Sequence, residues 1–107
     1  MTNLVLTNHA RFDRAERLSF IIAEVGIGEY IHETVEVVNG QLQIERITST
    51  GVLMIFGKDG NKEILVTGYF LTVARAYAIY RNEGHSNIPP RLYQRIIKNA
   101  AKYKSWF

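Results

Sequence analysis

The chain has 107 residues, 47% of them hydrophobic and 21% charged, which is typical of one globular domain, and we expect a single domain over residues 1–107. It contains no cysteine, which excludes disulfides, thiolate metal sites and thiol catalysis. The net charge of +3 is uneven: residues 91–107 carry five basic side chains and no acidic one, so the rest carries −2. A concentrated basic patch indicates a polyanionic partner, with nucleic acid as the first candidate.

The N-terminal region predicts a helix. Asp13 and Glu16 have the spacing of a capping box, and Gly26 is a suitable stop. Apolar residues recur between them at the spacing of a buried helix face: Leu18, Ile21, Ile22 and Val25. His9 then lies at or just before the N-terminus of this helix. Because residues 1–9 lack the basic start and apolar run of a secretory signal, and no run is long enough to span a membrane, we expect a cytoplasmic protein.

Four strand-like segments follow, and we interpret them as an antiparallel meander. They are residues 31–37, 42–50, 52–56 and 64–70. Asn39-Gly40 is a strong signal for a type I′ hairpin turn, and residues 57–61 predict the turn before the last strand.

Two helices are predicted after the strands, which completes an α+β fold. The first has an apolar stripe of Phe70, Val73, Ala74 and Tyr77 and ends by Gly84. Pro90 suits the first position of the second, whose buried stripe is Leu92, Ile96, Ala100 and Tyr103. Basic residues line another face of this last helix: Arg91, Arg95, Lys98 and Lys102.

The second strand changes from apolar to polar along one face. Arg46, Thr48 and Thr50 share parity with the apolar residues before them. Two interpretations remain open: a polar site at that end of the sheet, or a strand end that leaves the core and is solvated. Thr67 is the only hydroxyl in an otherwise apolar last strand, on the predicted face of Leu65 and Tyr69.

The histidines are scattered and the carboxylates form no ligand pattern, so we expect no metal and no cofactor. His9 precedes Arg14 and Arg17, and nearby positive charge at a helix N-terminus favours a neutral imidazole that can accept a proton. His32 is expected at the surface, and His85 in a solvated loop.

These residue types suit metal-free cleavage of RNA, in which the 2′-hydroxyl is the nucleophile and the protein supplies a base, an acid and cations. His9 would act as base or acid, and Arg46, with Arg14 or Arg17, would hold the phosphate. Thr67 or Thr48 would donate to a phosphoryl oxygen. Tyr69 would stack on a base or assist proton transfer.

The sequence also resembles a known superfamily. Thr7-Asn8-His9-Ala10, with Asp13, Arg14 and Arg17, is similar to the start of small toxin and phage-encoded domains. The segments 46–52 and 65–70 resemble their paired strands. These domains belong to the barnase–EndoU–colicin–RelE-like superfamily of metal-independent ribonucleases, which place a helical part before a four-stranded meander.

The resemblance implies a ribonuclease of toxin, phage or mobile-element type, with residues 8–70 as the nuclease-like core. It implies His9, Arg46 and Thr67 as catalytic residues, with Thr48 and Tyr69 second. Residues 71–107 are then a helical extension that binds RNA, covers the site or dimerises. RNA is the expected partner, and an antitoxin or immunity protein a further one.

Two other functions fit the same sequence. One is a non-catalytic nucleic-acid-binding module that uses the basic last helix. The other is a structural or interaction protein of a phage or mobile element, for which the aromatic C-terminal residues 103–107 would form a partner surface.

Overall fold

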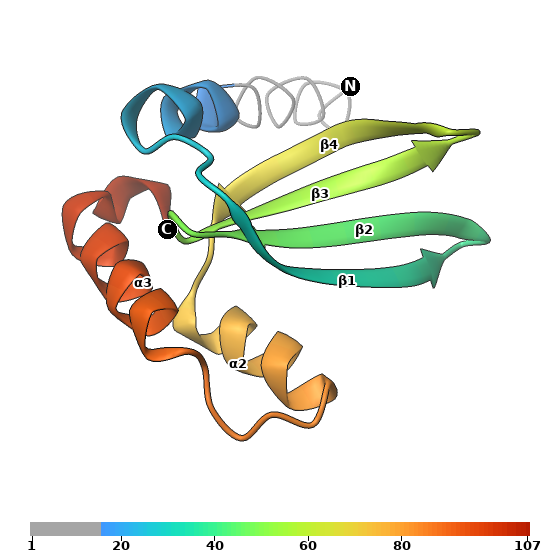
Figure 1. Cartoon of the computed structure of the whole chain (residues 1–107). Helices are drawn as coiled ribbons and strands as arrows, with labels where there is room; N and C mark the ends of the chain where they lie inside the picture. The colour runs from blue at the N-terminus through green and yellow to red at the C-terminus, as the bar shows by residue number, and fades with distance from the viewer. Residues whose placement is uncertain (1–15) are drawn as a thin grey trace, which may run out of the picture.

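The computed structural model describes residues 16–107, and its elements confirm the predicted α+β architecture (Figure 1). An N-terminal helix, described over residues 16–24, precedes four strands and two further helices. The elements after it are β1 (Tyr30–Val38), β2 (Gln41–Thr48), β3 (Val52–Asp59), β4 (Lys62–Phe70), α2 (Val73–Asn82), α3 (Pro90–Lys102) and the short 3₁₀ helix η1 (Lys104–Trp106).

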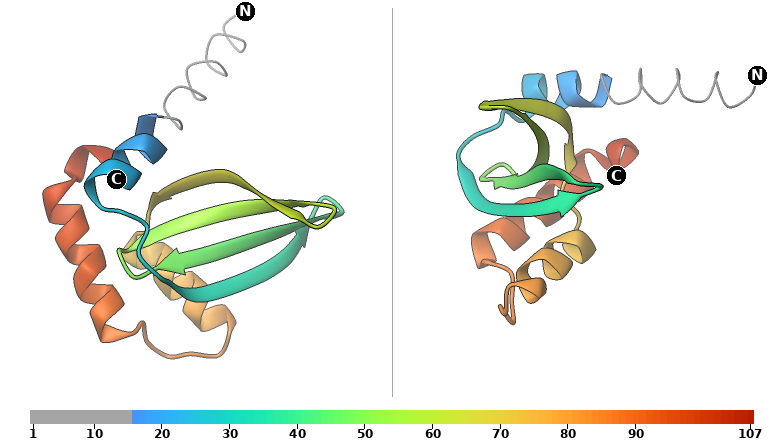
Figure 2. Two further views of the ribbon diagram at one scale, coloured as in Figure 1. Left: turned by 45° about the horizontal axis from the view of Figure 1, so that its top comes forward. Right: turned by 90° about the vertical axis from the view of Figure 1, so that its right-hand side faces the viewer.

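The strands form one antiparallel meander in the order β1-β2-β3-β4. Asn39 and Gly40 connect the first two strands, both with positive φ (53° and 78°), as the predicted type I′ turn requires. The second turn is shorter than predicted, because Gly57 remains in the ladder opposite Ile64 and only residues 60 and 61 separate β3 from β4. The sheet curls strongly, which gives it a concave and a convex face (Figure 2).

Each face of the sheet packs against helices. Ile47 and Leu53 point to the side covered by α2 and α3, where they join a buried cluster with Leu71, Ile79 and other residues of these helices. Alternate residues of the same strands point to the other side. There, Val52, Met54 and Phe70 pack with Ile21 of the N-terminal helix, beside Leu18 and Val25.

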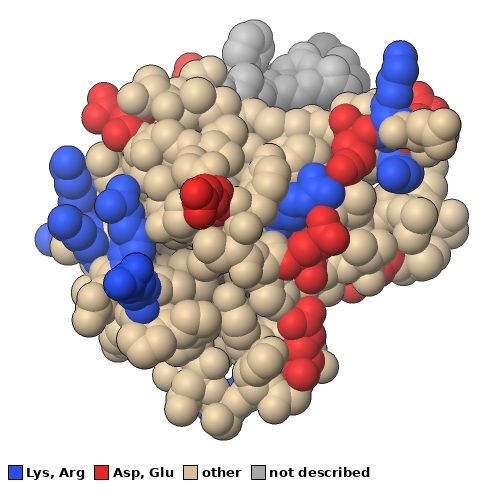
Figure 3. Space-filling model, viewed as in Figure 1, with Lys and Arg blue, Asp and Glu red and all other residues tan. Residues whose placement is uncertain are grey.

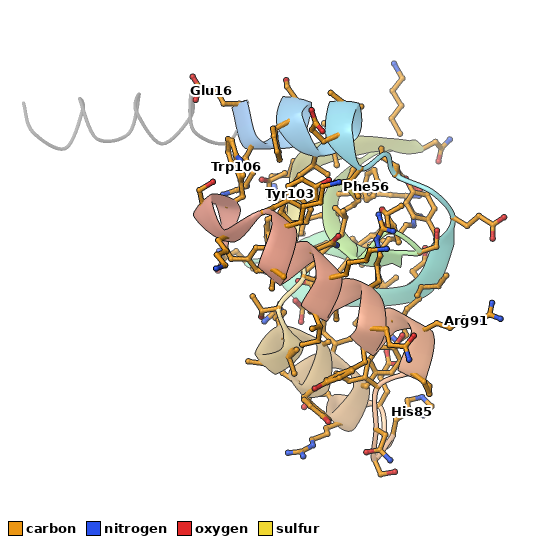
Figure 4. All side chains as sticks on the ribbon, turned by 90° about the vertical axis from the view of Figure 1, so that its left-hand side faces the viewer. Glu16, Phe56, His85, Arg91, Tyr103 and Trp106 are labelled. Carbon is orange, nitrogen blue, oxygen red and sulfur yellow. The ribbon has the colours of Figure 1, made fainter. Side chains whose placement is uncertain are left out.

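The N-terminal helix buries a slightly different face from the predicted one. Ile22 is 47% exposed, whereas Phe20 stacks on Trp106 with ring centres 4.8 Å apart and meets Tyr103 edge-on at 5.5 Å. Figure 4 shows Tyr103 and Trp106 below this helix, where the chain leaves α3. Phe20 therefore replaces Ile22 in the packed face of this helix, because the C-terminal aromatic residues contact Phe20. Gly26, with φ +76°, donates its N–H to the Ile21 carbonyl and ends the helix as predicted.

Two further predictions about the strand and helix patterns were wrong. Phe70 belongs to β4 and not to the following helix, which Thr72 caps by accepting the Arg75 N–H; Ala74 is exposed there. In β4, the register shifts so that Phe56 faces Leu65 while Ile55 faces Thr67. This bulge places Leu65 on the opposite face from Thr67 and Tyr69, although the three residues share parity.

Candidate nucleic-acid interface

The basic residues of α3 form a continuous surface, here called the basic face (Arg91, Arg95, Lys98 and Lys102). Their spacing of four, three and four residues stacks them along one side of the helix. All are exposed except Arg95, which is half-buried. Figure 3 shows Lys and Arg side chains gathered over α3 at the left of the molecule.

The basic face forms no ion pair with the carboxylates of residues 16–107. Within residues 16–107, none of its four side chains lies within 4.0 Å of an acidic group. The ion pairs of that part of the chain engage Glu33, Glu45, Glu63 and Glu83, which lie on the strands or at the end of α2. Four like charges on successive turns of a helix repel one another, and an anionic ligand would relieve that repulsion.

The orientation of the basic face is set by how α3 is anchored. Leu92 and Ile96 are buried in the core beneath α2 and α3. Buried Asn99 donates its side-chain N–H to the Thr50 carbonyl at 2.8 Å, and Arg95 Nε donates to the same oxygen at 3.4 Å. The turn between β2 and β3 therefore holds the middle of α3. Arg95 lies at the margin of this contact, and the other three residues of the basic face are exposed.

Arg46, a predicted catalytic residue, is already paired with two carboxylates. Its guanidinium donates to Glu33 at 2.7 Å and to both oxygens of Glu63 at 2.8 Å. The bond to Glu63, followed by the bond to Glu33, raises the pKa of Arg46 above its usual value. The guanidinium also lies 5.3 Å from the ring centre of Tyr30 and 4.8 Å from that of Phe56, and its side chain is only 16% exposed. A phosphate would have to displace these carboxylates to reach it.

Thr48 is fully buried at the end of β2. Its hydroxyl oxygen lies 2.9 Å from that of Thr50 and accepts the Val52 N–H at 3.2 Å, and Thr50 donates to the Gly26 carbonyl at 2.8 Å. These bonds tie the β2–β3 turn to the end of the N-terminal helix. Of the two open interpretations, that of a solvated strand end is wrong for Thr48, because this side chain is packed inside the protein.

Three other predicted residues come together at the exposed edge of the sheet. Arg17 of the N-terminal helix donates to the Thr67 hydroxyl at 3.2 Å and to the Gly68 carbonyl at 3.1 Å, and lies 5.5 Å from the ring centre of Tyr69. Both Thr67 and Tyr69 are half-buried. His9 and Arg14 lie outside the described residues. We call Arg17, Thr67 and Tyr69 the edge cluster.

His32 is not the surface residue predicted from strand parity, because its side chain is only 12% exposed. Its Nε2 lies 2.6 Å from Glu83 at the end of α2, and its ring centre lies 4.7 Å from that of Tyr80. Thr34 donates to the other oxygen of Glu83 at 3.1 Å. These contacts fasten the end of α2 to β1. The hydrogen bond with His32 lowers the pKa of Glu83.

A pocket of about 320 Å³ between α2 and α3 was not predicted. It is lined by Tyr77, Asn87, Ile88, Pro90, Tyr93 and Gln94. A sequence signal exists, since Tyr93 of the pocket lining falls outside the buried stripe of the helix, as does Ile97, which does not line the pocket. In the structure they are 42% and 45% exposed.

Among residues 16–107, no three His, Asp or Glu side chains lie close enough together to hold a metal ion. In that same part of the chain, no helix is long and apolar enough to cross a membrane.

No protein-family model matches the chain, and neither the curated proteins nor the solved structures contain a match. The resemblance to the barnase–EndoU–colicin–RelE-like superfamily therefore stays a prediction that rests on the sequence motifs.

Proposed function

We propose that this protein binds nucleic acid, with RNA as the expected ligand, through the basic face of α3. One observation carries the proposal: four cations share one face of α3, with three of them exposed and Arg95 half-buried, and no carboxylate of residues 16–107 lies within 4.0 Å of them. From Arg91 to Lys102 the helix rises about 16 Å, a length over which a nucleic-acid strand presents several phosphates.

Salt dependence of binding tests this proposal. Each phosphate contact releases counterions, so four contacts predict a slope of about −3 in a plot of log affinity against log salt for a single strand. The measurement is fluorescence anisotropy of a labelled RNA oligonucleotide at several salt concentrations. We expect Lys98→Gln and Arg91→Gln each to make the slope shallower by about 0.7.

Lys62→Gln is the matched control, because Lys62 is an exposed cation at the start of β4, outside α3. It should leave the slope unchanged. If Lys98→Gln and Lys62→Gln had equal effects, binding would follow net charge and the basic face would not be the interface. Heparin or anionic vesicles that bind with the same slope and the same response to Lys98→Gln would show a general polyanion site in place of one for nucleic acid.

A second candidate function is metal-independent RNA cleavage at the edge cluster. The observation that favours it is the contact of Arg17 with both Thr67 and Tyr69, which joins a cation, a hydroxyl and an aromatic ring at one edge of the sheet. His9 would supply the base or acid from the same end of the chain. An antitoxin or immunity protein would be the matching partner.

Cleavage of tRNA or mRNA in EDTA, with a 2′,3′-cyclic phosphate at the new end, is the expected result for this second function. His9→Ala and Thr67→Val should abolish it without lowering the thermal midpoint by more than a few degrees. Intact RNA after prolonged incubation, or full activity of Thr67→Val, would exclude cleavage at the edge cluster. Nucleic-acid binding by α3 would be unaffected by either result.

A further inference from the structure

We propose that the pocket between α2 and α3 accepts an unpaired base of a single-stranded nucleic acid whose phosphates lie on the basic face. This inference rests on the proposed function and specifies its ligand. It distinguishes single strands from duplexes, which the basic face alone does not.

The lining of the pocket suits a nucleobase. Tyr77 and Tyr93 offer aromatic rings on which a base can stack, and Ile88 and Pro90 add apolar surface. Gln94 and Asn87 carry side-chain amides that both donate and accept hydrogen bonds, as the edge of an unpaired base requires. A volume of about 320 Å³ admits one base.

The pocket adjoins the basic face through a shared residue. Gln94 lines the pocket, and it also lines a shallow depression of about 220 Å³ with Arg91, Arg95 and Lys98. A strand that rests its phosphates on this depression therefore has the pocket directly beside it. Figure 4 shows Arg91 near the start of α3, with its side chain directed away from the protein.

Positive charge also flanks the pocket on the side of α2. The Arg81 guanidinium lies 5.1 Å from the ring centre of Tyr77, which itself lines the pocket. A strand entering between the two helices would meet cations from both. A duplex could use the basic face, but its bases are stacked and paired and cannot enter the pocket.

Three RNA probes with nearly equal phosphate number test the inference: a single strand with bases, the same strand with abasic positions, and a duplex of half that length. We expect the wild-type protein to bind the base-bearing single strand at least about tenfold more tightly than the abasic strand, the size of effect that base–aromatic stacking produces. Tyr93→Ala and Tyr93→Leu should remove this preference and leave the affinity for the abasic strand unchanged.

Two further variants separate the pocket from the basic face. Ile97→Ala alters an equally exposed apolar residue of α3 that does not line the pocket, and it should keep the preference. Lys98→Gln should lower the affinity for all three probes by the same factor. Tyr93→Leu keeps an apolar side chain at a largely exposed position, so its thermal midpoint should stay near that of the wild type.

The outcomes distinguish base binding in the pocket from nucleic-acid binding by the basic face. Salt-dependent binding of all probes with equal affinity would overturn the base pocket and leave the basic face intact. A base preference that survives Tyr93→Ala and Tyr93→Leu would also overturn it, because the bases would then bind elsewhere. Absence of binding to every probe would overturn the proposed function and the pocket with it.

Discussion

Replacing Gly51 with alanine should disturb the contact between Asn99 of α3 and the β2–β3 turn. Gly51 lies in the β2–β3 turn with φ +78°, where an L side chain is rarely found. A Cβ atom at this position would stand 2.7 Å from Asn99 Nδ2 and 3.3 Å from Arg95 Cγ. Asn99 would have to move, and its hydrogen bond to the Thr50 carbonyl would be lost.

The chain offers a control with the same backbone geometry. Gly40 also has φ +78°, but a Cβ there would meet nothing within 4 Å. Gly40→Ala should therefore cost only the strain of the left-handed conformation, about 1 kcal/mol. Gly51→Ala adds the loss of a buried hydrogen bond, worth about 1–3 kcal/mol, so its total cost should be about 3 kcal/mol.

Urea denaturation of the two variants measures the difference, since the midpoint shifts while the slope should not change. In an Asn99→Ala background, the extra cost of Gly51→Ala should fall, because the crowded side-chain nitrogen is gone. Equal destabilisation by Gly51→Ala and Gly40→Ala would refute the reasoning, because it would mean that Asn99 does not hold α3 against this turn.

Three other predictions concern the sheet and its contacts with the helices. Leu53→Ala removes a fully buried side chain from the core beneath α2 and α3 and should cost about 3 kcal/mol in urea denaturation. Arg46→Met should lower the thermal midpoint by less than Leu53→Ala and leave RNA affinity unchanged; a loss of affinity would instead place Arg46 in the interface. The hydrogen bond with His32 lowers the pKa of Glu83 from 4.5, so its stabilisation is present above about pH 4.5 and is lost as the pH falls through the lowered value. Glu83→Gln should remove that part of the acid dependence, and an unchanged pH profile of the urea midpoints would contradict the assignment.

The features that the sequence predicted correctly depend on neighbours a few residues apart. Asn39 and Gly40 specify a hairpin because both adopt positive φ, and Pro90 starts α3 because its ring favours the first helical position. The basic face follows from helical periodicity alone, since residues three or four positions apart share a side of a helix. The order of helices and strands follows from the same kind of local pattern.

The features that the sequence did not predict depend on contacts between distant segments. The bulge in β4 separates Leu65 from Thr67, which a count of alternating residues cannot foresee. The His32 side chain is largely buried only because the end of α2 returns to β1 and places Glu83, 51 residues later in the chain, against it. Such contacts follow from packing and not from any local pattern.

The candidate sites divide in the same way. The sequence by itself determined that a strongly basic helix follows a four-stranded meander, and it identified the cations of that helix. Only the tertiary structure showed that Arg46 is paired with Glu33 and Glu63, and that Tyr77 and Tyr93 line one pocket beside the basic face. Strand pairing places Glu33 opposite Arg46. Tyr77 and Tyr93 reach one pocket because α2 and α3 both bury apolar residues against the same face of the sheet.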